Sequence, residues 1–188
     1  MKQNNNQSPA EIVAIKMAER MKQSAVTDDK RKGVLVIIDD KPPVADNTTL
    51  MLYTVKLRAV DEQKPTAYFP LNRSDVEVVN QFLAITTGIG VEKISAGQLS
   101  DDEWDLVNQK LPLLMDAPLY IDATTKMTLK ELKRKAEELS TEKGVSLMVI
   151  DHAQMMTVDG MPANSHRILA NIKAIAENLC ITIIAVLD

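Results

Sequence analysis

The sequence predicts an α/β domain with a mainly parallel central sheet. Short apolar runs rich in β-branched residues alternate along the chain with longer segments of helical periodicity. This alternation is typical of βαβ units, in which a helix connects two parallel strands. Of the 188 residues, 45% are apolar and 26% are charged, and the length suits one domain with a continuous core.

The predicted elements start with a strand at 34–38, whose uninterrupted apolar residues indicate burial on both faces. A loop with two prolines follows at 39–47. Further strands are predicted at 66–69, 119–122, 145–150 and 181–187, and helices at 48–60, 75–85, 101–115, 128–143 and 165–179. In parallel sheets, ligands bind beyond the C-terminal ends of the strands. A site is therefore expected among residues 39–49, 71–75, 122–126 and 151–165.

The residues before the main domain are predicted to form a tail, a helix and a linker. Residues 1–8 are polar and rich in Asn and Gln, which predicts a disordered tail. Residues 9–23 predict an amphipathic helix with Ile12, Ile15, Met17 and Met21 toward one side. The helix and a charged linker occupy 9–32, and the main domain occupies 33–188.

Charge and cysteine content exclude several classes of protein. The net charge of −4 argues against a nucleic-acid coat protein, which normally carries a strong positive field. A single cysteine, Cys180, excludes a disulfide within the chain and a cysteine-based metal site, and its apolar surroundings predict burial. Neither a signal peptide nor a membrane-spanning apolar run is evident. A cytoplasmic protein with no membrane contact is expected.

One predicted strand ends in an acid, at Leu147-Met-Val-Ile-Asp151. This is the form of a Walker B segment, in which the carboxylate holds the Mg²⁺ of a bound nucleoside triphosphate. Many α/β strands end in Asp simply to cap or orient the next loop. If Asp151 has only that capping role, we expect Gln154 to satisfy buried backbone groups and His152 to be a structural or solvent-facing residue.

Further motifs follow one another in a specific order. They are Ala67-Tyr-Phe-Pro-Leu71, Ile94-Ser-Ala-Gly-Gln-Leu99, Asp101-Asp-Glu-Trp104, Leu119-Tyr-Ile-Asp122, Met148-Val-Ile-Asp-His-Ala-Gln154-Met-Met156 and Ile172-Lys-Ala-Ile-Ala-Glu-Asn-Leu179. From about Gly33 to its end, the chain resembles the C-terminal motor domain of replicative, DnaB-type helicases. The resemblance implies a three-layer RecA-like domain of the P-loop NTPase fold, with ATP and Mg²⁺ as cofactors of an active member.

The chain departs from this family where the phosphates bind. The family carries Gly-Lys-Thr between the first strand and its helix, whereas this chain reads Pro42-Pro-Val-Ala-Asp46-Asn-Thr-Thr49. A carboxylate at Asp46 placed 4 Å from a phosphate would cost about 4 kcal/mol at an effective dielectric constant near 20. We therefore expect a degenerate Walker A segment and a vestigial nucleotide pocket. Its residues are Pro43, Ala45, Asp46, Asn47, Thr48, Thr49, Asp151 and Gln154, with Asp151 as the ligand if Mg²⁺ binds.

Two other catalytic elements of the family are also unmatched. The glutamate that activates the attacking water corresponds to Asn72, and an amide cannot accept the proton of that water near neutral pH. The family's last strand leads to a γ-phosphate-sensing Gln and an arginine finger, whereas this sequence ends at Asp188. We therefore expect no catalytic residue, no hydrolysis and no bound cofactor.

The loop that contacts DNA in the family corresponds to 157–165. It has no Lys or Arg, although phosphate binding favours cations. Gly160, Asn164 and Arg167 are the candidate DNA contacts, and we expect DNA binding to be weak or absent.

Two classes of function follow from these observations. The first is a catalytically inactive, helicase-like component of DNA replication or of a mobile element. It would bind a protein partner or itself through RecA-type edges and the helix at 9–23, although that helix can equally fold back on its own core. The second is an ATP-dependent DNA helicase or ATPase with an atypical nucleotide site. A remnant without a present role is a third possibility.

Overall fold

The computed structural model describes Ile12, Ile15 and Lys16, and residues 33–39, 47–158, 160–162 and 164–187. Within these ranges the elements are β1 (Val34–Ile38), α2 (Asn47–Lys56), a π-helical turn η1 (Leu57–Asp61), β2 (Thr66–Pro70), α3 (Asp75–Thr87), α4 (Val91–Ala96), α5 (Asp101–Met115), β3 (Leu119–Ile121), α6 (Leu129–Glu142), β4 (Leu147–Asp151), a 3₁₀ turn η2 (Ala153–Met155), β5 (Thr157–Val158), β6 (Met161–Pro162), α7 (Ser165–Leu179) and β7 (Thr182–Val186).

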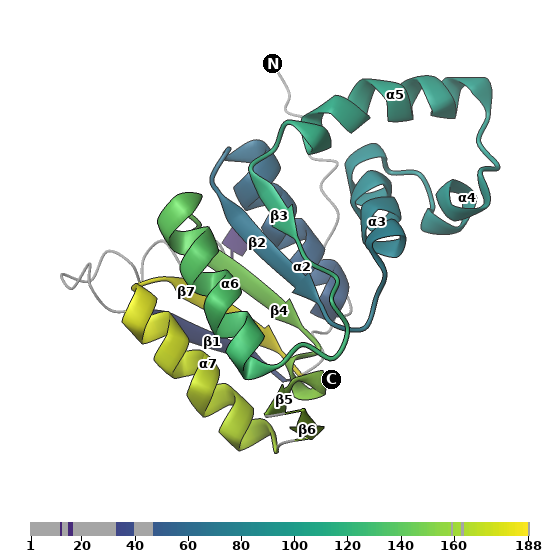
Figure 1. Cartoon of the computed structure of the whole chain (residues 1–188). Helices are drawn as coiled ribbons and strands as arrows, with labels where there is room; N and C mark the ends of the chain where they lie inside the picture. Colours follow the sequence, from purple (N-terminus) through teal and green to yellow (C-terminus); the bar gives the residue numbers. More distant parts are fainter. Residues whose placement is uncertain are drawn as a thin grey trace.

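The central sheet has five strands in the order β1-β7-β4-β2-β3, and all neighbouring strands are parallel. Helices α6 and α7 lie side by side on one face of the sheet, and α2 lies on the opposite face (Figure 1). The predicted three-layer α/β architecture with a parallel sheet is therefore confirmed. Because β4 and β2 lie inside the sheet, the C-terminal ends of these strands bring Asp151 and residues 71–75 together.

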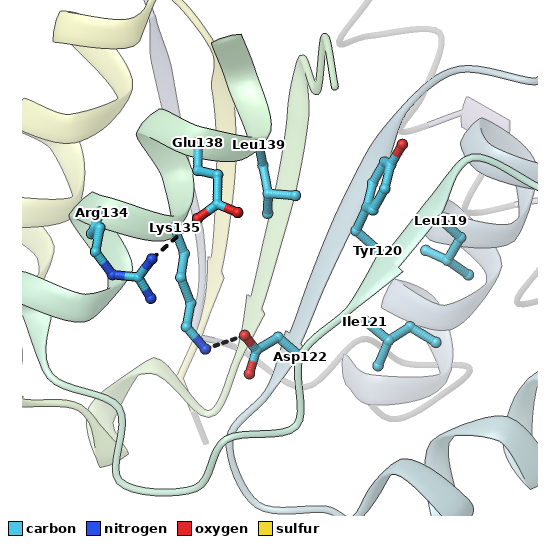
Figure 2. A pocket seen from close by; sticks show the side chains of 8 residues that line it. All are labelled: Leu119, Tyr120, Ile121, Asp122, Arg134, Lys135, Glu138 and Leu139. Atoms are coloured by element: carbon cyan, nitrogen blue, oxygen red, sulfur yellow. Dashed lines mark hydrogen bonds and ion pairs between the residues drawn. The ribbon is translucent and has the colours of Figure 1, made fainter. Parts of the chain in front are cut away.

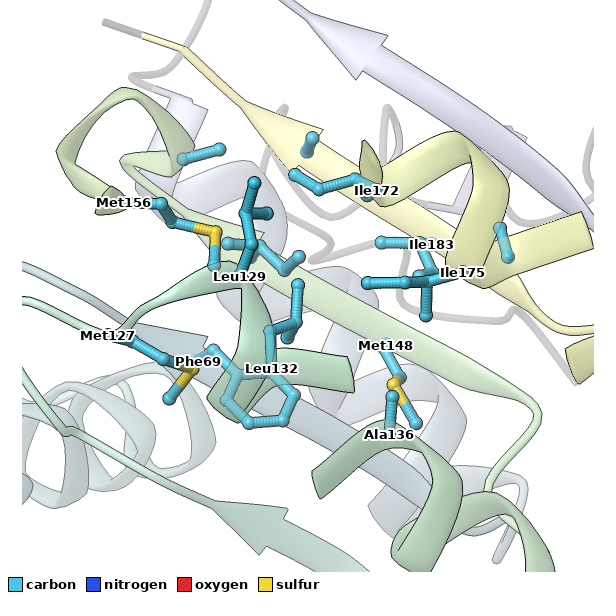
Figure 3. Close-up of a cluster of buried hydrophobic side chains, with 14 of the residues drawn as sticks. Phe69, Met127, Leu129, Leu132, Ala136, Met148, Met156, Ile172, Ile175 and Ile183 are labelled. Atoms are coloured by element: carbon cyan, nitrogen blue, oxygen red, sulfur yellow. The ribbon is translucent and has the colours of Figure 1, made fainter. Parts of the chain in front are cut away.

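Alternate side chains of the central strands point into two separate cores. Phe69 and Met148 face α6 and α7, where Leu132 and Ile172 pack against them (Figure 3). On the other face, Tyr68, Val149 and Ile184 pack against α2 and α3. Every residue of β2 and β4 is buried, which is the expected state of inner strands in a parallel sheet.

Helices α3, α4 and α5 form a lobe beside the β3 edge of the sheet (Figure 1). Its own core is a small cluster of three buried side chains, Leu83, Ile89 and Val107. Serine caps start both longer helices, because the hydroxyls of Ser74 and Ser100 accept hydrogen bonds from the third residue of α3 and of α5. The lobe leaves Trp104, Leu113 and Met115 exposed.

Several local features differ from the sequence prediction. Helix α4 and the β5–β6 hairpin were not predicted, because a six-residue helix and two-residue strands are too short to show a periodic pattern. The predicted helix at 48–60 divides into α2 and the π-helical turn η1. Cys180 is exposed, contrary to the prediction, because it forms the left-handed C-cap of α7 and lies outside the sheet.

Some predictions fall outside the described residues. Ile12, Ile15 and Lys16 are helical, as predicted, but the rest of the helix at 9–23, the tail at 1–8 and the linker to residue 32 lie outside them. The division of the chain into 1–8, 9–32 and 33–188 stays a prediction. In the part of the chain that the structure describes, no helix combines the length and apolar character that crossing a membrane requires.

Candidate functional site

Asp151, the last residue of β4, is the centre of the candidate site. Its side chain is fully buried, with 0% of its surface exposed. The hydroxyl of Thr48, at the start of α2, donates a hydrogen bond of 3.0 Å to Oδ2. The hydroxyl of Tyr68, on the neighbouring strand β2, donates a second bond of 3.0 Å to the same oxygen. The structure thus brings Thr48, at the start of the first helix after β1, to the Walker B-like acid Asp151.

Arg73 supplies the charge that balances this buried carboxylate. It lies in the loop between β2 and α3, and its Nη1 is 3.1 Å from Oδ2 of Asp151. The Arg73 side chain is only 22% exposed, so water screens this ion pair much less than one on the surface. Burial and then the negative charge of Asp151 raise the pKa of Tyr68 well above 10.0, so Tyr68 remains a hydroxyl donor.

The second oxygen of Asp151 faces His152. Nδ1 of His152 lies 3.1 Å from Oδ1, and Nε2 lies 2.9 Å from the side-chain amide nitrogen of Asn72. These distances favour the neutral tautomer in which Nδ1 carries the proton and Nε2 accepts from Asn72. His152 adopts the left-handed conformation (φ 60°, ψ 47°), which is uncommon for a residue with a side chain and turns its ring back toward β4.

This arrangement does not fit direct coordination of Mg²⁺ by Asp151. A magnesium ion needs carboxylate oxygens turned toward it in a nearly octahedral shell. Both oxygens of Asp151 instead accept from protein donors, which are Thr48, Tyr68, Arg73 and His152.

The other residues of the predicted pocket fall into two groups. Asn47 and Thr48 are buried at the start of α2, Thr49 follows them and is half-buried, and Gln154 lies in the 3₁₀ turn that follows Asp151. Pro43, Ala45 and Asp46 lie outside the described residues.

Sequence reasoning missed Arg73 and Tyr68 as partners of Asp151. The available signal was that Tyr68 lies within β2 and Arg73 lies just after it, but nothing in the sequence shows that β2 pairs with β4.

The candidate DNA contacts lie beside a short hairpin. Gly160 connects β5 and β6 with φ 78°. Asn164 is the N-cap of α7, where its Oδ1 accepts a hydrogen bond of 2.9 Å from the backbone N–H of Arg167. The side chain of Arg167 faces the space between α6 and α7. Of the three candidates, only Arg167 therefore offers a charge for contact with an anion.

A hollow of about 510 Å³ lies between the edge strand β3 and α6 (Figure 2). Lys135 forms an ion pair with Asp122 across it, and Arg134 pairs with Glu138 at 3.1 Å. Burial raises the pKa of Asp122, but hydrogen bonds from Lys135 and Thr124 outweigh burial and leave that pKa below its ordinary value. The charges that line this hollow are therefore balanced by their own neighbours.

Comparison with known proteins identifies the family. The family model of the DnaB-like helicase C-terminal domain matches residues 21–188. The chain belongs to this family. Among DnaB-like relatives, the chain is 25% identical over 164 residues to the replicative DNA helicase DnaB of Leifsonia xyli subsp. xyli, covering 85% of this chain and 36% of that protein. It is 27% identical over 165 residues to the replicative DNA helicase DnaB of Nostoc sp., covering 86% of this chain and 19% of the relative. The chain thus spans about a third or less of the length of these relatives.

Solved structures agree with the DnaB-like fold. One solved ATPase domain superposes with a TM-score of 0.69 at 16% identity, covering 96% of this chain and 71% of the other. A DnaB-like replicative helicase studied with primase superposes with a TM-score of 0.65 at 13% identity, covering 94% of this chain and 56% of the other. At these identities the likeness concerns the fold, and it confirms the RecA-like architecture predicted from the sequence.

Proposed function

We propose that this DnaB-like domain is catalytically inactive and serves as a structural or protein-interaction component linked to DNA replication or a mobile element, in the cytoplasm. The observation that carries this proposal is the buried network around Asp151. Arg73 supplies the positive charge that a metal ion would otherwise bring to this carboxylate. Because Thr48, Tyr68, Arg73 and His152 already donate to both oxygens of Asp151, this carboxylate holds the surrounding loops together and requires no nucleotide to do so.

Two departures from the family's sequence pattern support the same proposal. The segment Pro42–Thr49 has neither the glycine nor the lysine of a P-loop, so we infer a degenerate Walker A. Asn72, at the position of the catalytic glutamate, donates to His152 and is thereby held beside Asp151. An amide in this place can orient a water molecule but cannot deprotonate it near neutral pH.

The alternative function is an ATP-dependent DNA helicase or ATPase with an atypical nucleotide site. Its support is the contact between Thr48 and Asp151, because a P-loop hydroxyl beside a Walker B acid is what a magnesium–nucleotide site requires. The relatives at 25–27% identity are named replicative DNA helicases. In this alternative Arg73 has to move away from Asp151 before ATP and Mg²⁺ bind.

The partners that we propose are proteins. A solved DnaB-like structure is described with its interactions with primase, so partner binding has a precedent in this fold. RecA-type edges and the predicted helix at 9–23 are the candidate contact surfaces. DNA contact is proposed to be weak or absent, because Asn164 is used as a helix cap and Arg167 is the one cation among the candidate contacts.

Calorimetric titration with ATP and Mg²⁺ tests the inactive-domain proposal. We expect no heat of binding up to about 1 mM nucleotide, which corresponds to less than about 4 kcal/mol of binding free energy. A parallel phosphate-release assay should show no hydrolysis above the background. Manganese replaces magnesium in a second titration, because its binding is also seen by electron paramagnetic resonance.

Two variants make this titration decisive. Asp151→Asn removes the candidate metal ligand, and Asp61→Asn makes the same change at an exposed residue paired with Lys56. Micromolar binding by the wild type and by Asp61→Asn, lost in a folded Asp151→Asn protein, would establish the alternative and overturn the inactive domain.

A further inference from the structure

A groove of about 370 Å³ runs between α6 and α7, the two helices that lie side by side on one face of the sheet (Figure 1). Its floor is apolar and is formed by Leu129, Val158, Ala174 and Ile175. Its rim is polar, and every polar lining residue that the structure describes is either a cation or an amide: Lys130, Lys133, Arg167, Asn171 and Asn178. Among these described residues, no carboxylate lines the groove.

The lining residues of α7 follow one stripe along that helix. Arg167, Asn171, Ala174 and Asn178 are spaced three or four residues apart, so they share one face over about three helical turns. At a rise of about 1.5 Å per residue, this stripe is about 16 Å long. The groove is therefore elongated, and its length suits a short helix that lies along it.

The β5–β6 hairpin lies at one end of the groove and is held there. The backbone N–H of Thr157 donates a hydrogen bond of 3.2 Å to the carbonyl oxygen of Met127, just before α6, and the next residue, Val158, lines the groove. Met161 pairs directly with Val158 across the hairpin, and the side chains of such a pair lie on the same face. Met161 is 71% exposed, so the apolar floor continues into a flexible side chain that nothing in the described chain covers.

The positive charge of this groove is poorly compensated. Neither Lys130 nor Arg167 forms an ion pair with any residue that the structure describes, and Lys133 lies 3.8 Å from Glu137 in an exposed pair. Such an exposed pair contributes little and is easily exchanged for another partner. Lys130 and Arg167 also lie in the first turns of α6 and α7, where the helix dipole adds to the positive potential. The groove therefore favours a negatively charged occupant.

We propose that this groove is the docking site for an acidic amphipathic helix of a different protein. The apolar stripe of that helix packs on the groove floor and against Met161, and its carboxylates lie beside the cationic rim. The inference rests on the protein-interaction role proposed above, and it gives that role a surface and a partner chemistry. Neither a sheet edge nor the nucleotide pocket takes part.

The chemistry of the groove favours a helix over nucleic acid. Single-stranded nucleic acids bind through cations together with aromatic rings on which bases stack. In the described part of the chain no aromatic residue lines the groove, whereas its apolar floor and Met161 suit the side chains of an amphipathic helix. A groove of this size buries less area than a standard interface, so we expect weak binding, with a dissociation constant of roughly 10–100 μM.

Fluorescence anisotropy of a labelled synthetic peptide, titrated with the whole chain, tests the proposal. The probe is an end-capped helix of about 18 residues with leucines along one face, glutamates beside them and alanines elsewhere. We expect saturable binding at about 50 mM salt, weakened at least ten-fold near 500 mM salt, where charge interactions are screened. One control peptide scatters the same residues so that no apolar stripe forms, and another carries lysine in place of glutamate. Neither control peptide should bind.

Two variants assign the binding to the groove. Lys130→Glu with Arg167→Glu reverses the charge of the rim, and Met161→Glu places a charge at the end of the floor. We expect the rim variant to weaken binding of the acidic peptide at least ten-fold, and Met161→Glu to weaken it by about three-fold or more.

Each variant has a matched control. Arg134→Glu with Lys173→Glu changes charge on the same two helices outside the groove. Met115→Glu makes the Met161 change at a methionine of α5 that is 74% exposed. Both controls should bind the peptide like the wild type, and circular dichroism confirms that each variant folds.

Several outcomes overturn the docking site. The acidic peptide fails to bind the wild type up to about 1 mM chain, or the scattered or basic peptide binds equally well. The folded rim variant binds the acidic peptide as tightly as the wild type does. A labelled oligothymidine binds the wild type in place of the peptide and is lost in the rim variant, which would assign the groove to nucleic acid.

The peptide titration and the nucleotide titration fail separately. Loss of the docking site would leave the inactive domain standing, because the peptide experiment does not involve Asp151. Nucleotide binding in the calorimeter would overturn the inactive domain and leave the groove intact.

Discussion

Arg73 lies three residues beyond the end of β2, yet its guanidinium balances the negative charge of Asp151 at the end of β4. A fully buried carboxylate without a counter-charge is strongly unfavourable, and removing one partner of such a pair usually destabilises a protein by several kcal/mol. The partial exposure of Arg73 reduces this figure somewhat.

We predict that Arg73→Met lowers the free energy of unfolding by about 2–4 kcal/mol at neutral pH, measured by urea titration. Arg134→Met is the matched control, because Arg134 pairs with Glu138 at 3.1 Å and both side chains are more than half exposed. The control should lose only about 1 kcal/mol or less. Equal losses in the two variants would show that Asp151 is not specially dependent on Arg73.

At the scale of single elements, three helices start with the same reciprocal cap. Ser74 with Glu77, Ser100 with Glu103, and Thr128 with Glu131 form capping boxes at α3, α5 and α6. For Glu77 and Glu131, the hydrogen bonds from the cap residue's backbone N–H and hydroxyl lower the pKa of the carboxyl below its ordinary 4.5. For Glu103, a hydrogen bond from Lys93 lowers the pKa first and the cap second.

These lowered pKa values predict acid sensitivity. A carboxyl whose pKa is lower in the folded state stabilises the fold above its unfolded pKa, and this contribution is lost as the pH falls through the folded pKa. The thermal midpoint should therefore decrease between about pH 5 and pH 3. Glu131→Gln keeps the hydrogen bonds of the box but not the charge, so it should weaken this pH dependence. Glu142→Gln, in the last turn of the same helix, should leave the pH dependence nearly unchanged.

Gly33 lies just before β1, at a point where its backbone comes very close to the backbone of α7. A Cβ atom there would lie 1.6 Å from the carbonyl oxygen of Ala176, which is far inside van der Waals contact. Gly33→Ala should therefore lower the free energy of unfolding by more than about 2 kcal/mol. At Gly90 the nearest atom is a flexible Glu92 oxygen at 3.4 Å, so Gly90→Ala should be nearly neutral in the same urea titration. A neutral Gly33→Ala would mean that α7 lies farther from the start of β1.

The sequence predicted elements better than it predicted the site. The bounds of α5 and α7 were predicted to the residue, because amphipathic periodicity and capping residues mark their ends. At the site, Asp151 and Thr48 were predicted from their motif positions. The partners Tyr68, Arg73 and His152 were not, since their contacts depend on which strands are neighbours and on the left-handed turn at His152.

At the scale of the whole molecule, the α3–α5 lobe and the sheet differ in the amount of buried core. The lobe has a satellite cluster of Leu83, Ile89 and Val107, whereas β4 and β7 lie between two large cores. Local opening free energies follow the amount of buried apolar surface, so the lobe should open without unfolding the sheet.

Hydrogen exchange measured by mass spectrometry tests this difference. We predict that amides of α4 and α5 exchange through openings of lower free energy than those of β4 and β7. Exchange of α5 amides only through global unfolding would show that lobe and sheet form one cooperative unit.

Under the inactive-domain proposal, the guanidinium of Arg73 also sets the order of the substitutions that would be needed to engineer an ATPase from this domain. A P-loop lysine added first would bring a second cation toward an acid whose charge is already neutralised, and a glutamate at position 72 would remove the amide that His152 contacts. Neither change frees a carboxylate oxygen. On that proposal, replacement of Arg73 has to precede both, and we expect that first step to make the domain less stable before any activity is gained. Under the same proposal, any return to catalysis would have to begin with the loss of the Arg73–Asp151 ion pair, at a cost in stability.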